Sequence, residues 1–311
     1  MRRLKILTWH TRGSYLYYLS QAPHDFFVLP APGAGERYPW GDNVHHLPAG
    51  AARTRQFDCI LFQDRHAWQE DQFDSLTPGQ RALPRIYVEH APPGHPADAP
   101  HPVDDPGVLL VHVTPFNALM WDSRRTPARV IEHGVVIPES VRYLGTLERG
   151  LVIANHLERH GRRIGLDLFL QARAALPLDL AGSASETLGG LGEVPHAQLP
   201  ALAARYRFLF SPRRHASLSL GVIEAMMTGM PVVALATGEM ATVIDDGANG
   251  FIDTRLERLF DCMRDLLRSP SLARELGQAA RRRAQERFSI ERFIADWDAA
   301  FREVTESRSG A

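Results

Sequence analysis

Short hydrophobic runs, separated by turn-forming residues, recur along the first half of the chain. Runs such as "LKILTW" and "VLLVHVT" are rich in β-branched residues and show little alternation with polar ones. Such continuous runs are typical of strands buried on both faces of a parallel sheet. The other runs of this kind in the first half are "DFFVLP", "FDCILFQ", "RIYVEH" and "RVIEHGV".

Helical stretches separate some of these runs. In "TPFNALMWDS", Thr114 is suited to cap a helix and Pro115 to occupy its first turn. The segment 91–107 is too rich in proline for regular structure, so it predicts a long loop after the strand "RIYVEH". Residues 1–137 therefore predict one open α/β domain.

The alternation starts again after a plausible linker at 138–149. Strands "GLVIAN", "LDLAGS", "FLFSP" and "PVVALA" alternate with helical stretches, which predicts a second α/β domain over 150–290. In 291–305, Phe293, Trp297 and Phe301 fall on one helical stripe, and we expect this helix to pack back on the first domain. The predicted fold class is α/β, with two Rossmann-like domains whose parallel sheets face each other across a cleft.

Composition narrows the function. With 35 basic and 36 acidic residues among 311, the chain is not suited to bind nucleic acid. Lys5 is the only lysine, so a side chain that binds phosphate should be an arginine. Cys59 and Cys262 lie in apolar runs and are read as buried thiols. No apolar run is long enough to span a bilayer, so we expect a cytoplasmic protein.

The segment 211–235, "SPRRHASLSLGVIEAMMTGMPVVAL", has Glu224 as its only acid. A strand there leads through a turn into a helix that should start near Ser217 or Ser219, and that ends before Gly229. The N–H groups from Ser217 to Leu220 would then form an anion site. The carboxylate of Glu224 would lie beside this anion site and bind ribose hydroxyls. The alternative is an ion pair between Glu224 and a neighbouring arginine, Arg213 or Arg214.

The stretch "GVIEAMMTGMPVVALATGEMATVIDDGANGFIDT" resembles the donor-binding signature of glycosyltransferase family four. That resemblance implies the GT-B fold and a retaining, metal-independent transfer. It also implies a nucleoside-diphosphate sugar as donor substrate, with no cofactor. The matching positions are Glu224, Ala225, Met226, Gly229, Pro231, Val232, Val233, Ala234, Gly238, Ile244 and 246–250.

Three positions depart from the family pattern. The acid that the pattern places near the donor sugar falls at Ala216, and the acid of the following turn falls at Thr242. Glu239 takes the place of that turn's second glycine. We expect His215, Glu239 or the segment Ser217, Leu218 and Ser219 to serve the donor sugar instead.

By the same resemblance, an arginine and a lysine should hold the diphosphate after the first strand of the second domain. The expected arginine is His156 in this chain, and no lysine is present. Spacing favours Arg163 for this role and Arg159 next, with a solvated arginine-rich loop as the alternative.

Candidate residues in the first domain follow its strands. His90 ends "RIYVEH" and by the resemblance should face the donor sugar, where it could bind a hydroxyl or the acceptor. Gly13 lies in "WHTRGSY", a loop that could bring N–H groups close to the transferred group. No motif predicts a metal site. Residues 280–287, "ARRRAQER", are read as a helix surface, with a peripheral membrane contact as the alternative.

The sequence therefore favours a glycosyltransferase, with an acceptor that is a glycan, a lipid or a small molecule. Polysaccharide biosynthesis is the expected setting. A sugar-nucleotide epimerase and a non-catalytic sugar-nucleotide-binding subunit are the alternatives. The missing acid at Ala216 argues against the epimerase and for the non-catalytic subunit.

Overall fold

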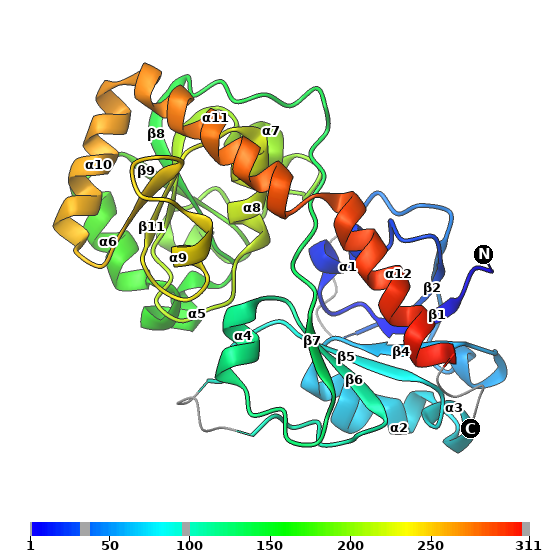
Figure 1. The fold of residues 1–311 in the computed structure, drawn as a ribbon. Helices are drawn as coiled ribbons and strands as arrows, with labels where there is room; N and C mark the ends of the chain where they lie inside the picture. Colours follow the sequence, from blue (N-terminus) through cyan, green and yellow to red (C-terminus); the bar gives the residue numbers. More distant parts are fainter. Residues whose placement is uncertain (1, 32–37, 95–99, 307–311) are drawn as a thin grey trace. The chain divides into compact units, whose positions relative to one another are not determined.

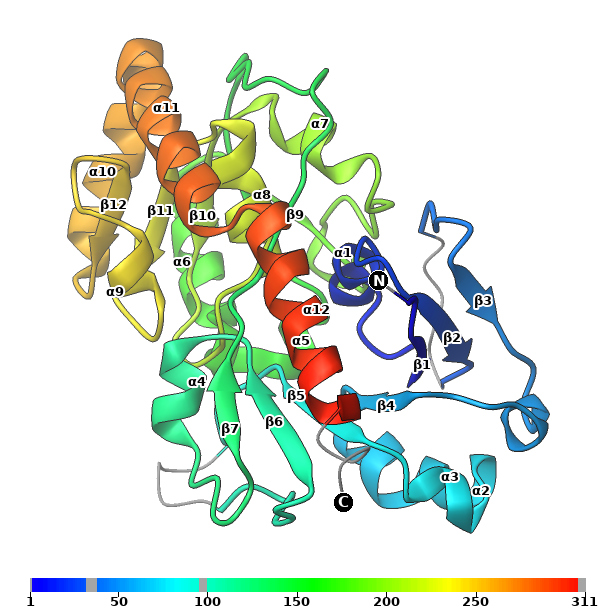
Figure 2. The same ribbon diagram turned by 45° about the vertical axis from the view of Figure 1, so that its right-hand side comes forward.

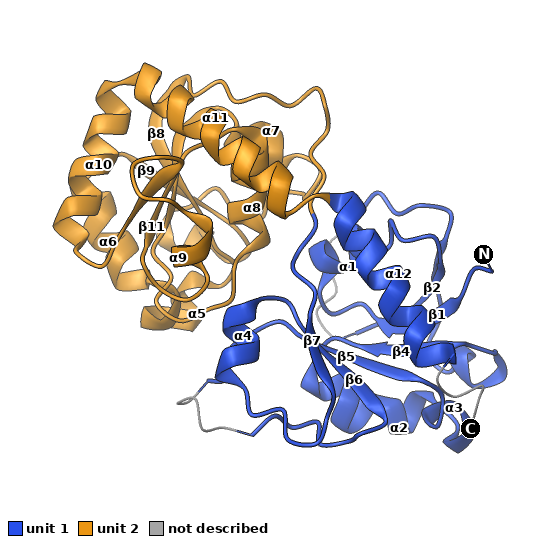
Figure 3. Cartoon of the chain, in the orientation of Figure 1, with its two compact units in different colours: residues 1–134, 290–311 blue, residues 135–289 orange. Residues whose placement is uncertain are grey.

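The computed structural model describes residues 2–31, 38–94 and 100–306. Helices and strands follow one another along the chain as Figure 1 shows. The chain divides into two compact units (Figure 3): unit 1 comprises residues 1–134 and 290–311, and unit 2 comprises residues 135–289. The helix expected over 291–305 is thus part of unit 1, and the segment 138–149 is part of unit 2.

Unit 1 contains a seven-stranded sheet in the order β3-β2-β1-β4-β5-β6-β7, and every neighbouring pair is parallel. Its strands are β1 (Lys5–Trp9), β2 (Asp25–Leu29), β3 (Val44–His46), β4 (Cys59–Phe62), β5 (Arg85–Glu89), β6 (Val108–His112) and β7 (Ala128–Val130). Between them lie α1 (Gly13–Leu19), η1 (Ala51–Thr54), η2 (Ala67–Asp71), α2 (Gln72–Ser75), α3 (Pro78–Arg81) and α4 (Pro115–Met120).

The last helix, α12 (Ile290–Glu306), packs on α1 within unit 1. Its buried stripe includes Phe293, Trp297 and Phe301, each fully buried. The indole N–H of Trp297 donates a hydrogen bond of 3.1 Å to the hydroxyl of Tyr15 on α1. The hydrophobic spacing in the sequence therefore identified the buried face of this helix correctly.

Unit 2 contains a five-stranded parallel sheet in the order β12-β11-β10-β8-β9. Figure 2 labels β9, β10, β11 and β12 of this sheet. Its strands are β8 (Leu147–Ile153), β9 (Leu178–Ala181), β10 (Tyr206–Ser211), β11 (Val232–Leu235) and β12 (Gly250–Asp253). The helices are α5 (Leu157–His160), η3 (Gly161–Ile164), α6 (Leu166–Ala175), η4 (Glu186–Leu188), α7 (Leu199–Ala203), α8 (Leu220–Thr228), α9 (Met240–Val243), α10 (Leu256–Arg268) and α11 (Pro270–Arg287).

One hydrophobic core joins this sheet to α6, α10 and α11. Phe169 of α6, Met263 of α10 and Leu276 of α11 lie in the same buried cluster as Phe208 and Phe210 of β10. A buried arginine, Arg207, binds the carbonyl groups of Leu266 and Leu267 near the end of α10. The cation thereby satisfies carbonyls that lack a partner within the helix.

The predicted α/β class with two parallel sheets is confirmed, and several boundaries differ. β7 (Ala128–Val130) contains only the first two residues of the expected strand "RVIEHGV". Gly13 does not lie in an open loop, because it is the first residue of α1. A Cβ at Gly13 would lie 2.3 Å from Cε2 of Tyr38, so close packing explains this glycine. The hydrophobic pattern also missed β3 and β12, which are three and four residues long.

Candidate functional site

The strand order of unit 2 reverses between β8 and β10. From β8 the chain passes to β9 on one side and later to β10, β11 and β12 on the other. In open parallel sheets, ligands bind at the carboxyl ends of the strands where the order reverses in this way. The two strands end at Ile153 and Ser211, so the segments 154–165 and 212–219 form the candidate site.

These two segments are held together through Arg163 and Gly165. The carbonyl of Arg163 accepts hydrogen bonds of 3.1 Å from the N–H groups of Arg214 and His215, and Nε of Arg163 donates to the His215 carbonyl at 3.1 Å. Gly165 has φ +91°, and a Cβ there would lie 2.1 Å from the carbonyl oxygen of Pro212. The structure thus brings two predicted site residues, Arg163 and His215, into direct contact.

Positive charge is concentrated at this edge of the sheet. Arg162 and Arg214 both pair with Asp167 at 2.6–2.7 Å. Within the described ranges, Arg159 and Arg213 form no ion pair with an acidic residue. From the sequence alone, Arg213 was expected only as an alternative partner for Glu224.

Two observations identify Arg213 as part of the cationic site. Burial lowers the pKa of Arg213, whose Nη2 donates to the Ile153 carbonyl at 3.3 Å. Partial burial and then the charges of Arg159, Arg163, His156 and Arg213 lower the pKa of His160. An anion bound here would relieve their mutual repulsion.

Helix α8 begins beside these cations. Its N-cap is Ser219, with φ −79° and ψ 136°, so the helix starts where the sequence predicted. In the part of the chain that the structure describes, none of the N–H groups of residues 218–221 donates a hydrogen bond. Leu218 is buried, and Ser217 and Ser219 are half-buried. A helix start with such N–H groups attracts anions.

Glu224 lies in the second turn of α8 and is 4% exposed. Its Oε1 lies 3.0 Å from Nε2 of His196, which is also buried. The alternative ion pair with Arg213 or Arg214 is therefore wrong, because Arg214 pairs with Asp167 and Arg213 binds a backbone carbonyl. His196 was missed because no spacing rule links the segment before α7 to α8.

Glu239 lies at the N-cap of α9 and is 3% exposed. Its Oε1 accepts hydrogen bonds from Nη2 of Arg287 at 2.8 Å and from Oγ1 of Thr242 at 2.5 Å. Arg287 belongs to the segment read as a helix surface, and that reading is wrong for this residue. The end of α11 packs against the turn before α9, and Arg283 also donates to the carbonyl of Thr242.

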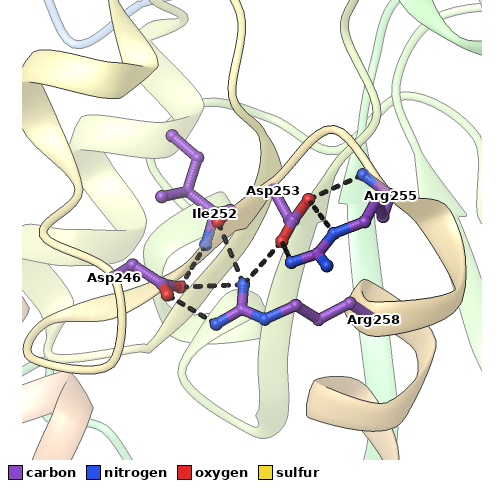
Figure 4. A network of polar contacts seen from close by, with 5 residues as sticks. All are labelled: Asp246, Ile252, Asp253, Arg255 and Arg258. Carbon is purple, nitrogen blue, oxygen red and sulfur yellow. Dashed lines mark hydrogen bonds and ion pairs between the residues drawn. The ribbon is translucent and has the colours of Figure 1, made fainter.

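The Asp-Gly-Ala-Asn-Gly turn at 246–250 has a structural basis (Figure 4). Asp246 accepts a hydrogen bond from the N–H of Ile252 at 3.0 Å and pairs with Arg258 at 2.5 Å. Arg258 also binds Asp253, whose other hydrogen bonds come from Arg255. These hydrogen bonds lower the pKa of Asp253. The turn of the family signature is therefore fixed by ion pairs to the start of α10.

In unit 1, His90 follows β5, and its ring packs edge-on against Tyr15 with centroids 4.6 Å apart. Its Nε2 is buried and has no hydrogen-bond partner among the described residues. Burial, followed by the charges of Arg12 and His133, holds the pKa of His90 well below its usual value. His90 is therefore a neutral imidazole at neutral pH. The preceding Glu89 contacts His101 at 3.2 Å.

Two features are absent from the described ranges. There, no group of three or more His, Cys, Asp or Glu residues is arranged to hold a metal ion. No helix in the same ranges has the length and apolar character needed to cross a membrane.

A family model and a known relative match parts of the sequence. Residues 162–299 match the family model described as "Glycosyl transferase-like". Over 88 residues, the chain is 36% identical to the sucrose synthase of Acidithiobacillus caldus. The aligned segment covers 26% of this chain and 11% of that protein. The match thus spans about a tenth of that relative's length.

Comparisons of structure cover nearly the whole chain. Sucrose-phosphate synthase from Thermosynechococcus elongatus has a TM-score of 0.72 at 15% identity, over 98% of this chain and 100% of that one. HepE from Anabaena, in complex with UDP and glucose, has a TM-score of 0.68 at 13% identity, over 96% and 99%. AviGT4, a glycosyltransferase involved in avilamycin A biosynthesis, has a TM-score of 0.65 at 17% identity, over 99% of each chain.

At these identities the structural neighbours establish the fold, and the family model adds the sequence relationship over most of the second unit and the first part of α12. The chain has the GT-B fold, and its residues 162–299 match a glycosyl transferase-like family model. The resemblance to glycosyltransferases is thereby confirmed over these residues, and the assignment to family four stays a prediction.

Proposed function

We propose that this protein is a glycosyltransferase that takes its sugar from a nucleoside-diphosphate sugar. The observation that carries the proposal is the position of Glu224, a buried carboxylate in the second turn of α8 beside the open N–H groups of residues 218–221. The whole arrangement lies within the segment that matches the glycosyl transferase-like family. HepE and TarM, two structural neighbours, were crystallised with UDP, which makes UDP the first nucleotide to test.

In this proposal, unit 2 binds the nucleotide. Glu224 accepts hydrogen bonds from the ribose hydroxyls, and the diphosphate lies against the N–H groups at the start of α8. Arg163, Arg159 and Arg213 supply the positive charge. His215, Ser217, Leu218 and Ser219 line the same turn and are the candidates for contacts with the donor sugar.

The chemistry follows from the leaving group. The bond between C1 of the sugar and the diphosphate oxygen breaks, and its electron pair stays on the diphosphate. A bond forms between C1 and the acceptor oxygen, whose proton passes to the departing diphosphate. Groups aimed at the developing negative charge lower the barrier. Arginine side chains and helix N–H groups are such donors, and they can act without a metal ion or a cofactor. Transfer with retention at C1 is part of the proposal.

We assign the acceptor to unit 1. The neutral imidazole of His90, whose buried Nε2 has no hydrogen-bond partner in the described part of the chain, is suited to exchange a hydrogen bond with a hydroxyl of the donor sugar or the acceptor. Gly13 packs against Tyr38 and has a weaker case as an N–H donor. Glu239 also has a weaker case, because Arg287 and Thr242 already bind its carboxylate.

A non-catalytic sugar-nucleotide-binding subunit is the second candidate. Ala216 favours it, because the family pattern has an acid near the donor sugar at this position. An epimerase would need acid–base groups at the same place. This chain has Ala216 and Thr242 at the two positions where the family pattern has an acid.

The deciding experiment incubates the purified chain with a panel of nucleoside-diphosphate sugars, with and without acceptor extracts, and measures the release of nucleoside diphosphate. Release that depends on acceptor supports the glycosyltransferase. Tight binding with no release supports the non-catalytic subunit, and formation of a donor isomer supports the epimerase. Repeating the assay with EDTA and determining the anomeric configuration of the product by NMR test metal independence and retention.

A further inference from the structure

His196 and Glu224 form a buried contact at the candidate site. Nε2 of His196 lies 3.0 Å from Oε1 of Glu224, and the two side chains are 8% and 6% exposed. His196 precedes α7, in the connection that leaves β9 at its carboxyl end. Glu224 lies near the start of α8, which follows the carboxyl end of β10. Both residues therefore belong to the edge of the sheet where a ligand is expected.

Both partners are held by other contacts. The carbonyl of Pro195 accepts hydrogen bonds from the N–H groups of Gln198 and Leu199, at 2.8 and 3.1 Å, which fixes the turn that carries His196. On α8, the hydroxyl of Thr228 donates to the main-chain carbonyl of Glu224 at 2.8 Å. The histidine therefore approaches the carboxylate from a hydrogen-bonded turn.

Hydrogen-bond chemistry gives this contact a direction. A carboxylate buried away from water needs hydrogen-bond donors, since its desolvation is otherwise unfavourable. A carboxylate oxygen is an acceptor, so Nε2 of His196 carries the hydrogen. Two carboxylate oxygens offer about four acceptor positions. One hydrogen bond from His196 fixes the rotamer of Glu224 and still leaves acceptor capacity for a ligand.

We propose that His196 is a positioning residue for donor recognition. Its Nε2–H holds the carboxylate of Glu224 in the orientation that accepts hydrogen bonds from the 2′- and 3′-hydroxyls of the donor's ribose. The inference rests on the proposed function, and it specifies that function further: the ligand is a ribonucleoside diphosphate, and selection against nucleotides without ribose hydroxyls depends on His196.

The test measures binding of UDP, ADP and GDP to the full chain by calorimetry. The tightest of the three is then compared with its 2′,3′-dideoxy counterpart. Hydrogen bonds to a charged group are strong, so we expect the wild-type chain to bind the ribonucleotide about tenfold or more tightly than the dideoxynucleotide. The quantity to follow is this ratio of the two dissociation constants.

Three variants separate positioning from simple structural support. His196→Ala removes the hydrogen bond, and its ratio should fall to within about threefold of unity. His196→Gln places an amide N–H near the position of Nε2, so the ratio should be at least partly restored. Thr228→Val is the matched control: it removes a buried hydrogen bond to the carbonyl of Glu224 without touching the carboxylate. It should lower the melting temperature and leave the ratio unchanged.

The outcomes are distinguishable. If the wild-type chain binds none of the three nucleotides, or binds both forms equally, the ribose assignment of Glu224 fails and this inference fails with it. If the wild-type chain discriminates and a folded His196→Ala still discriminates equally, the positioning role alone is overturned. If His196→Ala does not fold, His196→Met takes its place, because it fills the space without donating a hydrogen bond: loss of the ratio supports the proposal, and an unchanged ratio overturns it.

Discussion

Arg287, at the end of α11, reaches across to Glu239 at the start of α9, with Nη2 2.8 Å from Oε1. The carboxylate side chain is 2% exposed and the guanidinium 17% exposed. The same carboxylate oxygen binds the hydroxyl of Thr242. This contact fixes the glycine-containing turn that precedes α9, which belongs to the stretch that resembles the donor-binding signature.

Glu239→Ala should therefore lower the free energy of unfolding by about 3 kcal/mol, because it leaves Arg287 without its buried partner. Urea denaturation followed by far-UV circular dichroism measures this. Arg264→Ala is the control, since Arg264 pairs with Asp261 on the surface of α10 and should contribute less than about 1 kcal/mol. A Glu239→Ala variant of wild-type stability with weakened donor binding would instead support a contact between Glu239 and the donor sugar.

The cationic edge of unit 2 predicts a specific pattern in the kinetics. Arg163→Ala and Arg213→Ala should each lower kcat/KM for glycosyl transfer by about a hundredfold, because each removes positive charge from the leaving diphosphate. Arg149→Ala is the matched control, since Arg149 pairs with Asp179 at the amino-terminal half of β8, away from the ligand edge. Near-normal transfer by the Arg163 or Arg213 variant would remove that residue from the role.

Burial of His112 makes the stability of unit 1 depend on pH. Burial and then the charge of His101 lower the pKa of His112 from 6.5 to about 4. Below pH 6.5 the unfolded chain takes up a proton that the folded chain does not. The stability linked to His112 is therefore complete above pH 6.5 and is lost as the pH falls toward 4, by about 3 kcal/mol in total.

His112→Gln should reduce this loss between pH 6.5 and pH 4 by about the same amount. Tryptophan fluorescence follows unit 1 selectively, because Trp9, Trp40, Trp68, Trp121 and Trp297 all belong to it. If the stability of the variant and that of the wild-type chain fell by the same amount between pH 6.5 and pH 4, the prediction would be contradicted.

Gly165 should tolerate no side chain. It has φ +91°, and a Cβ there would collide with the backbone of Pro212, so Gly165→Ala should cost about 2 kcal/mol or more in the free energy of unfolding. It should also disturb donor binding, because the close approach of Gly165 to Pro212 also brings Arg163 into contact with His215. Gly189→Ala is the control, with φ +67° but no atom nearer than 3.9 Å to the added carbon. Equal losses in the two variants would mean that backbone conformation alone matters, without the collision.

The pattern of hydrophobic runs was sufficient for most elements of the fold. Continuous runs identified β5, β6 and β10, because a strand buried on both faces needs apolar residues at every position. Thr114 caps α4 as expected, with its hydroxyl accepting from the N–H of Asn117 at 3.0 Å. Short edge strands such as β3 were not predicted, because the hydrophobic pattern of three residues cannot be distinguished from that of a loop.

The candidate site was predictable only in part. The position of Glu224 at the start of a helix after a buried strand follows from local sequence, and the family resemblance gave it a ligand. Its partner His196 could not be found in this way, because 28 residues separate the two and only the packing of α7 on α8 joins them. Arg213 was missed for a related reason: whether a guanidinium pairs with an acid depends on which carboxylates the fold brings near.

By itself, therefore, the sequence determined two parallel-sheet units, the helix start beside the proposed phosphate site and the carboxylate at Glu224. These features depend on residue periodicity and on backbone groups that neighbouring residues control. Only the tertiary structure decided which charges meet: Arg214 with Asp167, Arg287 with Glu239, and His196 with Glu224. Such pairs depend on distances of a few ångströms between segments that are remote in sequence, and hydrophobic pattern does not encode those distances.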